Sequence, residues 1–244
     1  MSVARTSIRK LVLILSLCTI SFVAVVSVGA KKDAYPFGDH DSYVTSATEF
    51  AGWNDLLERS KDQEAEVQQC VQSKESCQRH LRSLRVILQS AASLEPMQQV
   101  KLVNRYVNRF GKHRYKKDKQ ISIPTEKGNF RIRHDWVTLS EFLKRGGDCE
   151  DYATTKYQIL RILGMPAEDL RIVIAYDRFE REYHGLVAVR LENNESFLLD
   201  TDNRIYARQP TRYRYIFSLN EDAIWDHDIK SIRVPRSLAN RFKQ

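Results

Sequence analysis

The spacing of apolar residues changes along the chain from a helical to a strand-like period. Between residues 46 and 110 apolar side chains recur at intervals of three and four, as in Leu81, Leu84 and Leu88. Pro96 falls in the first turn of one such stretch, a position that tolerates proline. We predict that residues 46–110 form an N-terminal layer of helices.

The C-terminal part of the chain favours antiparallel strands. Apolar and aromatic residues fill short runs there, and the polar stretch Glu192–Glu195 between two of them predicts a turn. The predicted strands are 170–176, 183–191, 196–200 and 213–217. Helices followed by strands indicate an α+β fold.

Two short helices are expected just before these strands. The first begins near Thr138 and ends at a glycine C-cap, Gly146. The second runs from Cys149 or Glu150 to about Leu163. The preceding residues, 111–136, are basic and irregular, and we expect a surface loop with short strands. Residues 111–244 form the catalytic core in this interpretation, in one domain with the helical layer.

The first 30 residues have the pattern of an export signal. Cations at Arg5, Arg9 and Lys10 precede an apolar run, which ends in the small residues Val28-Gly29-Ala30. This is the layout of a cleavable signal peptide, with a retained membrane anchor as the alternative. We expect an exported protein and a flexible lead-in over residues 31–45.

Charge and cysteines narrow the picture further. The formal net charge is +8, but the positive residues are spread out and no nucleic-acid motif accompanies them. On one straight helix Cys70 and Cys77 would lie about 10 Å apart, too far for a disulfide. We expect a bridge through a turn over Gln72–Ser76, since exported proteins meet oxidising conditions. Cys149 then remains as a free thiol.

Cys149, His184 and Asp200 follow one another in the order nucleophile, base and orienting acid. Cys149 lies at a predicted helix N-terminus, where a thiolate is favoured, while His184 and Asp200 lie in or at the end of predicted strands. Taken singly, a histidine in an apolar strand is usually a core residue, and an aspartate at a strand end usually forms a turn. Asp202 and Asn203 are alternatives to Asp200.

The acids next to Cys149 oppose its ionisation. Like charges on Asp148, Glu150 and Asp151 disfavour a thiolate. A bound Ca²⁺ would neutralise them, since carboxylates are its preferred ligands. Alternatively, the acids simply favour the first turn of the helix. Both interpretations stay open. The other histidines lack metal-like spacing and no CxxC or HExxH motif occurs, so zinc is not expected.

Strand register sets a condition on the site. A turn centred within Glu192–Glu195 pairs Asp200 with Val187, about 10 Å along the strand from His184. We therefore predict an asymmetric turn or a bulge that brings His184 and Asp200 together.

The run Gly147-Asp148-Cys149-Glu150-Asp151-Tyr152-Ala153 resembles the bacterial transglutaminase-like cysteine proteinases, including the LapG-type periplasmic proteases. Supporting residues are Thr138, Glu141-Phe142-Leu143, Lys156-Tyr157, Trp53, the spaced Cys70 and Cys77, Phe217-Ser218-Leu219-Asn220 and Trp225. The resemblance extends over most of residues 46–228. One departure is that Thr201 follows Asp200 where the family more usually has asparagine, which keeps Asp202 as the fallback.

The resemblance implies a papain-like fold with Cys149 as nucleophile, His184 as base and Asp200 as orienting acid. It also implies calcium bound through Asp148, Glu150 and Asp151. Family substrates are large surface adhesins, cleaved near a di-alanine site, and release of the adhesin promotes biofilm dispersal. The implied partner is an inner-membrane cyclic di-GMP receptor that sequesters the periplasmic protease.

Two other functions fit the same residues. An amine that intercepts the thioester would turn the same triad to transglutamination. A secreted adaptor would keep the acids as a structural calcium site without using the thiol.

Overall fold

The computed structural model describes residues 36–37, 42–47, 50–109, 115–117, 121–124, 130–133, 136–208 and 210–227. The predicted signal sequence, residues 1–30, lies outside this range. So do residues 31–35 and 38–41 of the predicted lead-in. Over the described residues, none of the helices combines the length and the apolar character that a membrane crossing needs.

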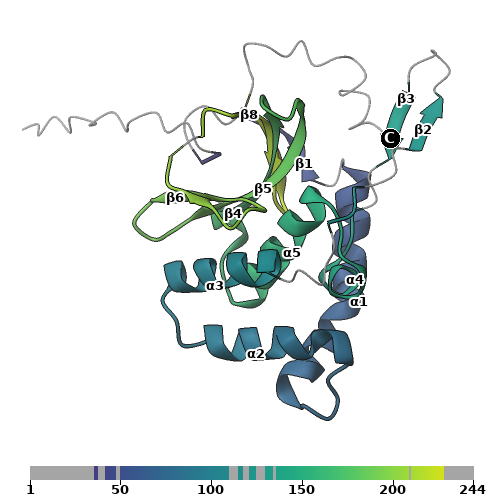
Figure 1. The fold of residues 1–244 in the computed structure, drawn as a ribbon, viewed down its shortest axis with the longest axis vertical. Coiled ribbons are helices and arrows are strands. Elements are labelled where there is room, and N and C mark those ends of the chain that lie inside the picture. The colour runs from purple at the N-terminus through teal and green to yellow at the C-terminus, as the bar shows by residue number, and fades with distance from the viewer. Residues whose placement is uncertain are drawn as a thin grey trace, which may run out of the picture. The chain divides into compact units, whose positions relative to one another are not determined.

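Helices precede most of the strands, as the hydrophobic pattern predicts (Figure 1). The helices are α1 (Ala51–Gln72), η2 (Arg79–Leu81), α2 (Arg82–Ala91), α3 (Pro96–Arg109), α4 (Leu139–Arg145), α5 (Cys149–Ile162) and η3 (Ala167–Asp169). The α+β prediction is confirmed.

Seven of the described strands form one antiparallel sheet, in the order β1-β9-β8-β4-β5-β6-β7. Its strands are β1 (Ser42–Ser46), β4 (Leu170–Asp177), β5 (Glu182–Arg190), β6 (Ser196–Leu199), β7 (Ile205–Tyr206), β8 (Tyr213–Leu219) and β9 (Ala223–Asp226). A separate pair, β2 (Ile121–Pro124) and β3 (Phe130–Arg133), confirms the short strands predicted between residues 111 and 136.

The predicted lead-in is shorter than expected. Residues 42–45 belong to β1, which pairs with β9 from Ser42 opposite Asp226 to Ser46 opposite Ala223. The strand is short and polar, and its partner lies far along the chain. Local periodicity therefore gives no sign of it, because only the distant pairing makes these residues a strand.

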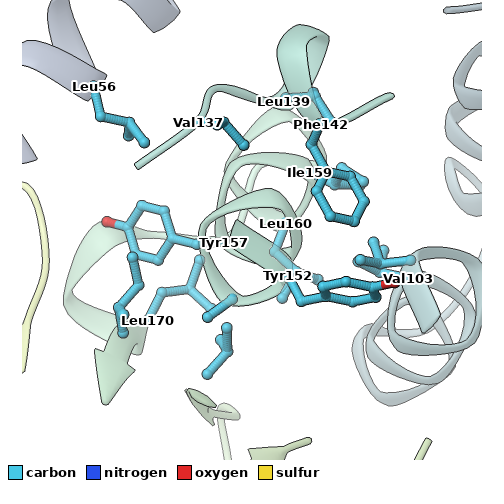
Figure 2. Close-up of a cluster of buried hydrophobic side chains, with 14 of the residues drawn as sticks. Leu56, Val103, Val137, Leu139, Phe142, Tyr152, Tyr157, Ile159, Leu160 and Leu170 are labelled. Atoms are coloured by element: carbon cyan, nitrogen blue, oxygen red, sulfur yellow. The ribbon is translucent and has the colours of Figure 1, made fainter. Parts of the chain in front are cut away.

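The main core lies between the sheet and the helices. Helix α5 packs on β5 and β4, and it also contacts α3 and α4. Figure 2 shows the buried side chains around α5, where Phe142 meets Tyr152 edge to face at 4.8 Å between ring centroids. Leu160 and Leu170 are fully buried in the same cluster. The core thus fixes α5 against the strands that carry the predicted catalytic residues.

The other face of the sheet has its own buried cluster. It contains Val173, Ala175, Leu186, Ala188, Leu198, Tyr213 and Tyr215. Neighbouring residues on the same strands, such as Ile174 and Val187, belong instead to the core shared with the helices. This alternation follows from the two-residue period of a strand, and it puts Tyr213 on the face of the sheet that carries Leu186.

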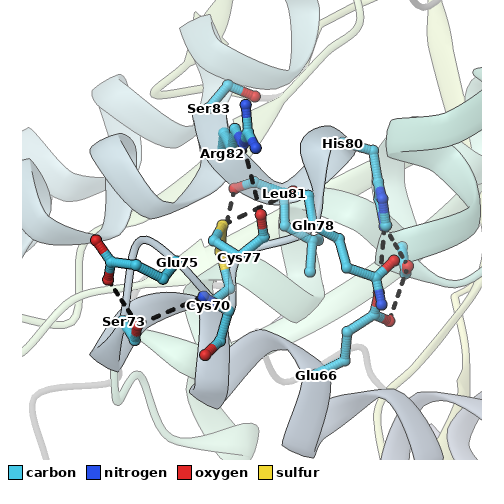
Figure 3. The surroundings of a disulfide bond; sticks show 12 residues. Glu66, Cys70, Ser73, Glu75, Cys77, Gln78, His80, Leu81, Arg82 and Ser83 are labelled. Carbon is cyan, nitrogen blue, oxygen red and sulfur yellow. Dashed lines mark hydrogen bonds and ion pairs between the residues drawn. A yellow bond between two sulfur atoms is a disulfide. The ribbon is translucent and has the colours of Figure 1, made fainter.

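A disulfide joins Cys70 to Cys77, with their Cα atoms 3.9 Å apart (Figure 3). Helix α1 ends at Gln72 and the chain turns before η2, so the cysteines do not share one straight helix. The Ser73 hydroxyl contacts Glu75 and accepts from the Ser76 N–H within this turn. The predicted disulfide is confirmed, and the predicted turn is what brings the two cysteines together.

Candidate active site

Local sequence explains how the two helices around the site begin and end. Thr138 caps α4 by accepting from the Glu141 N–H, and Glu141 reciprocates at the Thr138 N–H. Gly146 ends α4 with a φ of +74°, a conformation that favours glycine. At Gly147 a Cβ atom would lie 2.0 Å from Asp151 Oδ2, so a side chain there would collide with the cap of α5.

Asp151 fixes the start of α5 to the chain before it. One carboxylate oxygen accepts from the Asp148 N–H at 3.1 Å and the other from the Val137 N–H at 2.9 Å. Asp151 is buried, so these bonds replace water at a charged group. The sequence left open whether the acids bind calcium or stabilise the first turn of the helix. At Asp151 the structure shows the second role, helix capping.

Cys149 is the first residue of α5 and is 5% exposed. Its thiol donates to Glu150 Oε2 at 2.8 Å. Burial and the neighbouring Glu150 carboxylate raise the pKa of the thiol well above its usual value, against the opposing effect of the Gly185 N–H. The predicted conflict between the thiolate and its acidic neighbours is thus present in the folded protein.

His184 and Asp200 lie in direct contact. His184 Nε2 is 2.8 Å from Asp200 Oδ1, and the Asp200 side chain is almost completely buried. Burial works against the charge of Asp200, but hydrogen bonds from His184, Tyr213 and Thr201 lower the pKa of this carboxyl to about 2. Asp200 is therefore an anion at any pH near neutrality.

The predicted bulge is absent from the pairing of β5 and β6, but the turn between them does differ from the symmetric one considered from the sequence. Strands β5 and β6 pair without a register shift over their described residues, ending with Val187 opposite Leu199. Arg190 pairs with Ser196, so the turn spans residues 191–195 and the pairing is shifted by one residue from the one considered from the sequence. Asp200 therefore continues on the same side of the sheet as His184, two positions away. Diagonal neighbours of this kind lie about 7–8 Å apart at the backbone, within reach of two polar side chains.

Gly185 joins the two parts of the site. Its N–H hydrogen-bonds the Cys149 sulfur. A Cβ atom at this position would lie 2.8 Å from Glu150 Cα and 2.9 Å from Glu150 N. Only a glycine lets the backbone of β5 approach the first turn of α5 so closely. Gly185 follows His184 directly in the sequence. The close approach therefore places the Cys149 thiol against the backbone of the residue that adjoins His184.

Two side chains, the buried Lys156 and the partly buried Asn108, hold the backbone of Asp200, and the sequence interpretation missed this role for both. Lys156 Nζ donates to the Asp200 carbonyl oxygen at 2.8 Å, and Asn108 Nδ2 donates to the same oxygen at 2.7 Å. Burial lowers the pKa of the Lys156 ammonium to about 7, with the Asp200 and Asp202 charges opposing the shift. One signal was available, because Lys156 shares its helix face with Tyr152 and Leu160.

The fallback residue Asp202 points to other partners. It is exposed and forms an ion pair with Arg204 at 3.2 Å. Thr201, the departure from the usual family pattern, donates its N–H to Asp200 Oδ1 at 2.6 Å. Asp200 is the one of these two carboxylates that the structure joins to His184.

A short segment, residues 115–117, contacts the site and was also missed. The Tyr115 hydroxyl hydrogen-bonds the Cys149 thiol, and the Lys116 N–H donates to the Gly147 carbonyl at 3.0 Å. Lys117 forms an ion pair with Glu182. Tyr115 also lines an open pocket that contains His184, Asp200 and Tyr213. The segment lies within a basic, irregular stretch whose sequence carries no periodic signal.

Asp148, Cys149 and Glu150 form a buried group of potential metal ligands. Their ligand atoms all lie within 4.8 Å of one another. The two carboxylates are the oxygen donors that Ca²⁺ prefers, whereas a thiol is not. The clustering of buried, like-charged carboxylates fits a divalent cation of this class, because such charges need compensation when they leave water.

Comparisons with known proteins agree on the family. None of the curated proteins matches the chain. Among solved structures, LapG of Legionella pneumophila is similar, with a TM-score of 0.52, 22% identity and coverage of 72% of this chain and 95% of LapG. Its calcium-bound structure gives 0.51 at 19% identity, with 77% and 97% covered. At these identities the likeness shows the fold, a papain-like α+β core.

The sequence profile of one family matches residues 59–227, which include Cys149, His184 and Asp200. The match covers more than half of the chain, and it agrees with the motif around Cys149 and with the shared fold. The chain therefore belongs to the bacterial transglutaminase-like cysteine proteinases.

Proposed function

We propose that this protein is a calcium-dependent cysteine endopeptidase of the periplasm, with Cys149, His184 and Asp200 as its catalytic triad. The observation that carries the proposal is the 2.8 Å contact between His184 Nε2 and Asp200 Oδ1. Gly185, the residue after His184, hydrogen-bonds the free Cys149 at the start of α5, and the chain belongs to a cysteine proteinase family.

The contact assigns a role to each ring nitrogen of His184. Asp200 accepts the hydrogen on Nε2, so Nδ1 is the nitrogen left to take the proton of the Cys149 thiol. The thiolate attacks the peptide carbonyl carbon, and the N–H of Cys149, which has no partner within the helix, faces the developing oxyanion. His184 then protonates the leaving amine, and water hydrolyses the thioester to release the acid and the thiol.

Asp148 and Glu150 would hold the calcium ion, and Asp151, whose oxygens already accept the N–H groups of Val137 and Asp148, would contribute through its remaining lone pairs. When bound, calcium neutralises the carboxylates that raise the pKa of Cys149 and so favours the thiolate. The support is the buried carboxylate group beside the thiol, together with the similarity to a LapG that was solved both calcium-bound and after EGTA treatment.

The proposed substrate is a large surface adhesin, cleaved near a di-alanine site, and the proposed consequence is release of the adhesin and biofilm dispersal. An inner-membrane cyclic di-GMP receptor is the proposed regulatory partner. Family membership supports these assignments, and the export signal predicted in residues 1–30 supports the periplasmic location.

The direct test uses peptides containing an alanine-alanine bond and compares the wild-type protein with Cys149→Ala. The wild-type protein should cleave them, and the variant should fold normally and be inactive. Cleavage by the alanine variant would exclude Cys149 as nucleophile. A labelled amine added to the same assay separates hydrolysis from acyl transfer, since only a transferase incorporates the label efficiently.

Calcium dependence needs its own experiment. A calcium-selective chelator should abolish cleavage and lower the melting temperature, and added Ca²⁺ but not Mg²⁺ should restore both. Unchanged activity and melting temperature under chelation would contradict the calcium assignment. An adaptor that binds calcium without catalysis would instead show the thermal shift, no cleavage, and no alkylation of Cys149 in the calcium-loaded protein.

A further inference from the structure

Tyr213 contacts both residues of the His184–Asp200 pair. Its hydroxyl donates to Asp200 Oδ2 at 2.6 Å, and its ring stacks on the imidazole at 5.5 Å between centroids with a 14° interplanar angle. Tyr213 is 2% exposed, so these contacts are not in competition with water. One buried side chain thus meets the base and its acid at the same time.

The hydroxyl completes the hydrogen bonding of the carboxylate. Oδ1 of Asp200 accepts from His184 and from the Thr201 N–H, whereas Tyr213 donates to Oδ2. Lys156 and Asn108 already fix the Asp200 carbonyl, so the backbone cannot shift to compensate for a lost side-chain contact. The Tyr213 hydroxyl therefore restricts the remaining freedom, which is rotation of the carboxylate about its own bond.

The ring restricts the imidazole in the same way. A histidine side chain turns broadly about its second torsion unless neighbours fix the ring plane. The stacked Tyr213 ring supplies such a surface for His184. Arg212 lies over the Tyr213 ring at 5.0 Å and is itself held by an ion pair with Asp177. The tyrosine is therefore anchored independently of the two residues that it contacts.

We propose that Tyr213 is a positioning residue of this site: its hydroxyl orients the Asp200 carboxylate and its ring orients the His184 imidazole. Together they present Nδ1 of His184 to Cys149 with the proton kept on Nε2. The catalytic consequence rests on the proposed function, whereas the orientation of the imidazole does not.

The test compares Tyr213→Phe with Tyr215→Phe. Both changes remove one buried hydroxyl from the same face of β8, but the Tyr213 ring stacks on His184, whereas the Tyr215 ring contacts His227. Tyr213→Phe should lower kcat roughly ten- to a hundredfold, the value of a hydrogen bond to a charged group. KM should stay within about twofold, because substrate contacts are unchanged. Tyr215→Phe should leave kcat near the wild-type value.

A second readout does not depend on cleavage. Nitrogen-15 NMR of the His184 ring should show the proton on Nε2 in the wild-type and Tyr215→Phe proteins, and a mixture of tautomers in Tyr213→Phe. Tyr213→Leu, if it folds, should show a further loss of the Nε2–H form. Equal tautomers and equal kcat in the two phenylalanine variants would overturn the proposal. Were the wild type to cleave nothing, the proposed function would fail while the tautomer comparison still decided the role of Tyr213.

Discussion

The two parts of the site differ in how completely the protein stabilises them. In the sheet half, formed by His184, Asp200 and Tyr213, the charged carboxylate has hydrogen-bond donors on both oxygens. In the helix half, formed by Asp148, Cys149 and Glu150, three acidic groups are buried together and the thiol donates to a carboxylate. In the proposed triad, His184 is therefore oriented by protein contacts alone, whereas Cys149 is held in its protonated form.

This difference has a direct physical origin. In the sheet half burial by itself opposes the charge of Asp200, but the hydrogen bonds from His184, Tyr213 and Thr201 outweigh it and lower the pKa of this carboxyl to about 2. In the helix half burial and like charge act in the same direction and raise the pKa of Cys149. Removing a charge in the sheet half should therefore lower the catalytic activity, whereas removing a charge in the helix half should raise the reactivity of the Cys149 thiol. At Gly185, where the two halves meet, the size of the side chain should decide the effect.

The largest effect is expected from Asp200→Asn. An amide cannot hold the proton on His184 Nε2 as a carboxylate does, and comparable changes in other triads lower kcat roughly 10³- to 10⁴-fold. Peptide cleavage measures this. Asp202→Asn is the matched control, since Asp202 is exposed and pairs with Arg204. If Asp202→Asn were the more damaging change, Asp202 and not Asp200 would be the orienting acid.

Gly185→Ala tests the contact between the two halves. The new Cβ would meet the backbone of Glu150 at 2.8 Å, which must shift α5 away from β5. We expect a loss of about 1–3 kcal/mol in the free energy of unfolding and a fall in activity of at least tenfold, roughly the cost of a small misplacement. Gly52→Ala is the control, because a Cβ atom there meets nothing within 4 Å. Equal behaviour of the two variants would show that the close approach is unimportant.

Glu150→Gln should act in the opposite direction on the thiol. Removing the carboxylate charge lowers the pKa of Cys149, because Glu150 is, after burial, the main cause of its elevation. In chelator-treated protein the rate of alkylation by iodoacetamide near neutral pH should rise about tenfold for each unit by which the pKa falls. Glu221→Gln, which alters the far end of α5, should leave the rate unchanged. A slower reaction in Glu150→Gln would mean that the carboxylate assists the thiol instead.

The smallest effect concerns stability in acid. Asp200 has a folded-state pKa of about 2 against 3.8 in its unfolded reference, so its contribution is present above pH 4 and is lost as the pH falls towards 2. The contribution is of the order of 2 kcal/mol. Denaturant unfolding of the wild-type and Asp200→Asn proteins should therefore converge between pH 4 and 2. Parallel curves across that range would indicate that the sheet half does not stabilise the carboxylate.

Local sequence predicted the features that local chemistry determines. Thr138 and Gly146 mark the ends of α4 through capping, and Cys149 begins α5 as expected. The strand positions of His184 and Asp200 were also predictable, but not their register, because a shift of one residue in the turn changes the face on which Asp200 lies.

The residues that were missed act over long distances. The sequence identifies Tyr213 only as a strand residue. Its contact with Asp200 depends on how the sheet brings β8 near the end of β6. Tyr115 lies in a stretch without periodicity, and Asn108 reaches Asp200 from a different helix. Such contacts arise from tertiary packing, which periodicity within one segment cannot report.

Hydrogen exchange of the buried Lys156 side chain can report how often this site opens to solvent. Its Nζ is fully shielded from solvent beneath Asp200. Protons on such a group exchange with water only when the surrounding packing opens, so their exchange rate counts the openings between α5 and the sheet. Hydrogen exchange measured at this one nitrogen would therefore give the rate at which the helix half separates from the sheet half, with no substrate and no mutation in the protein.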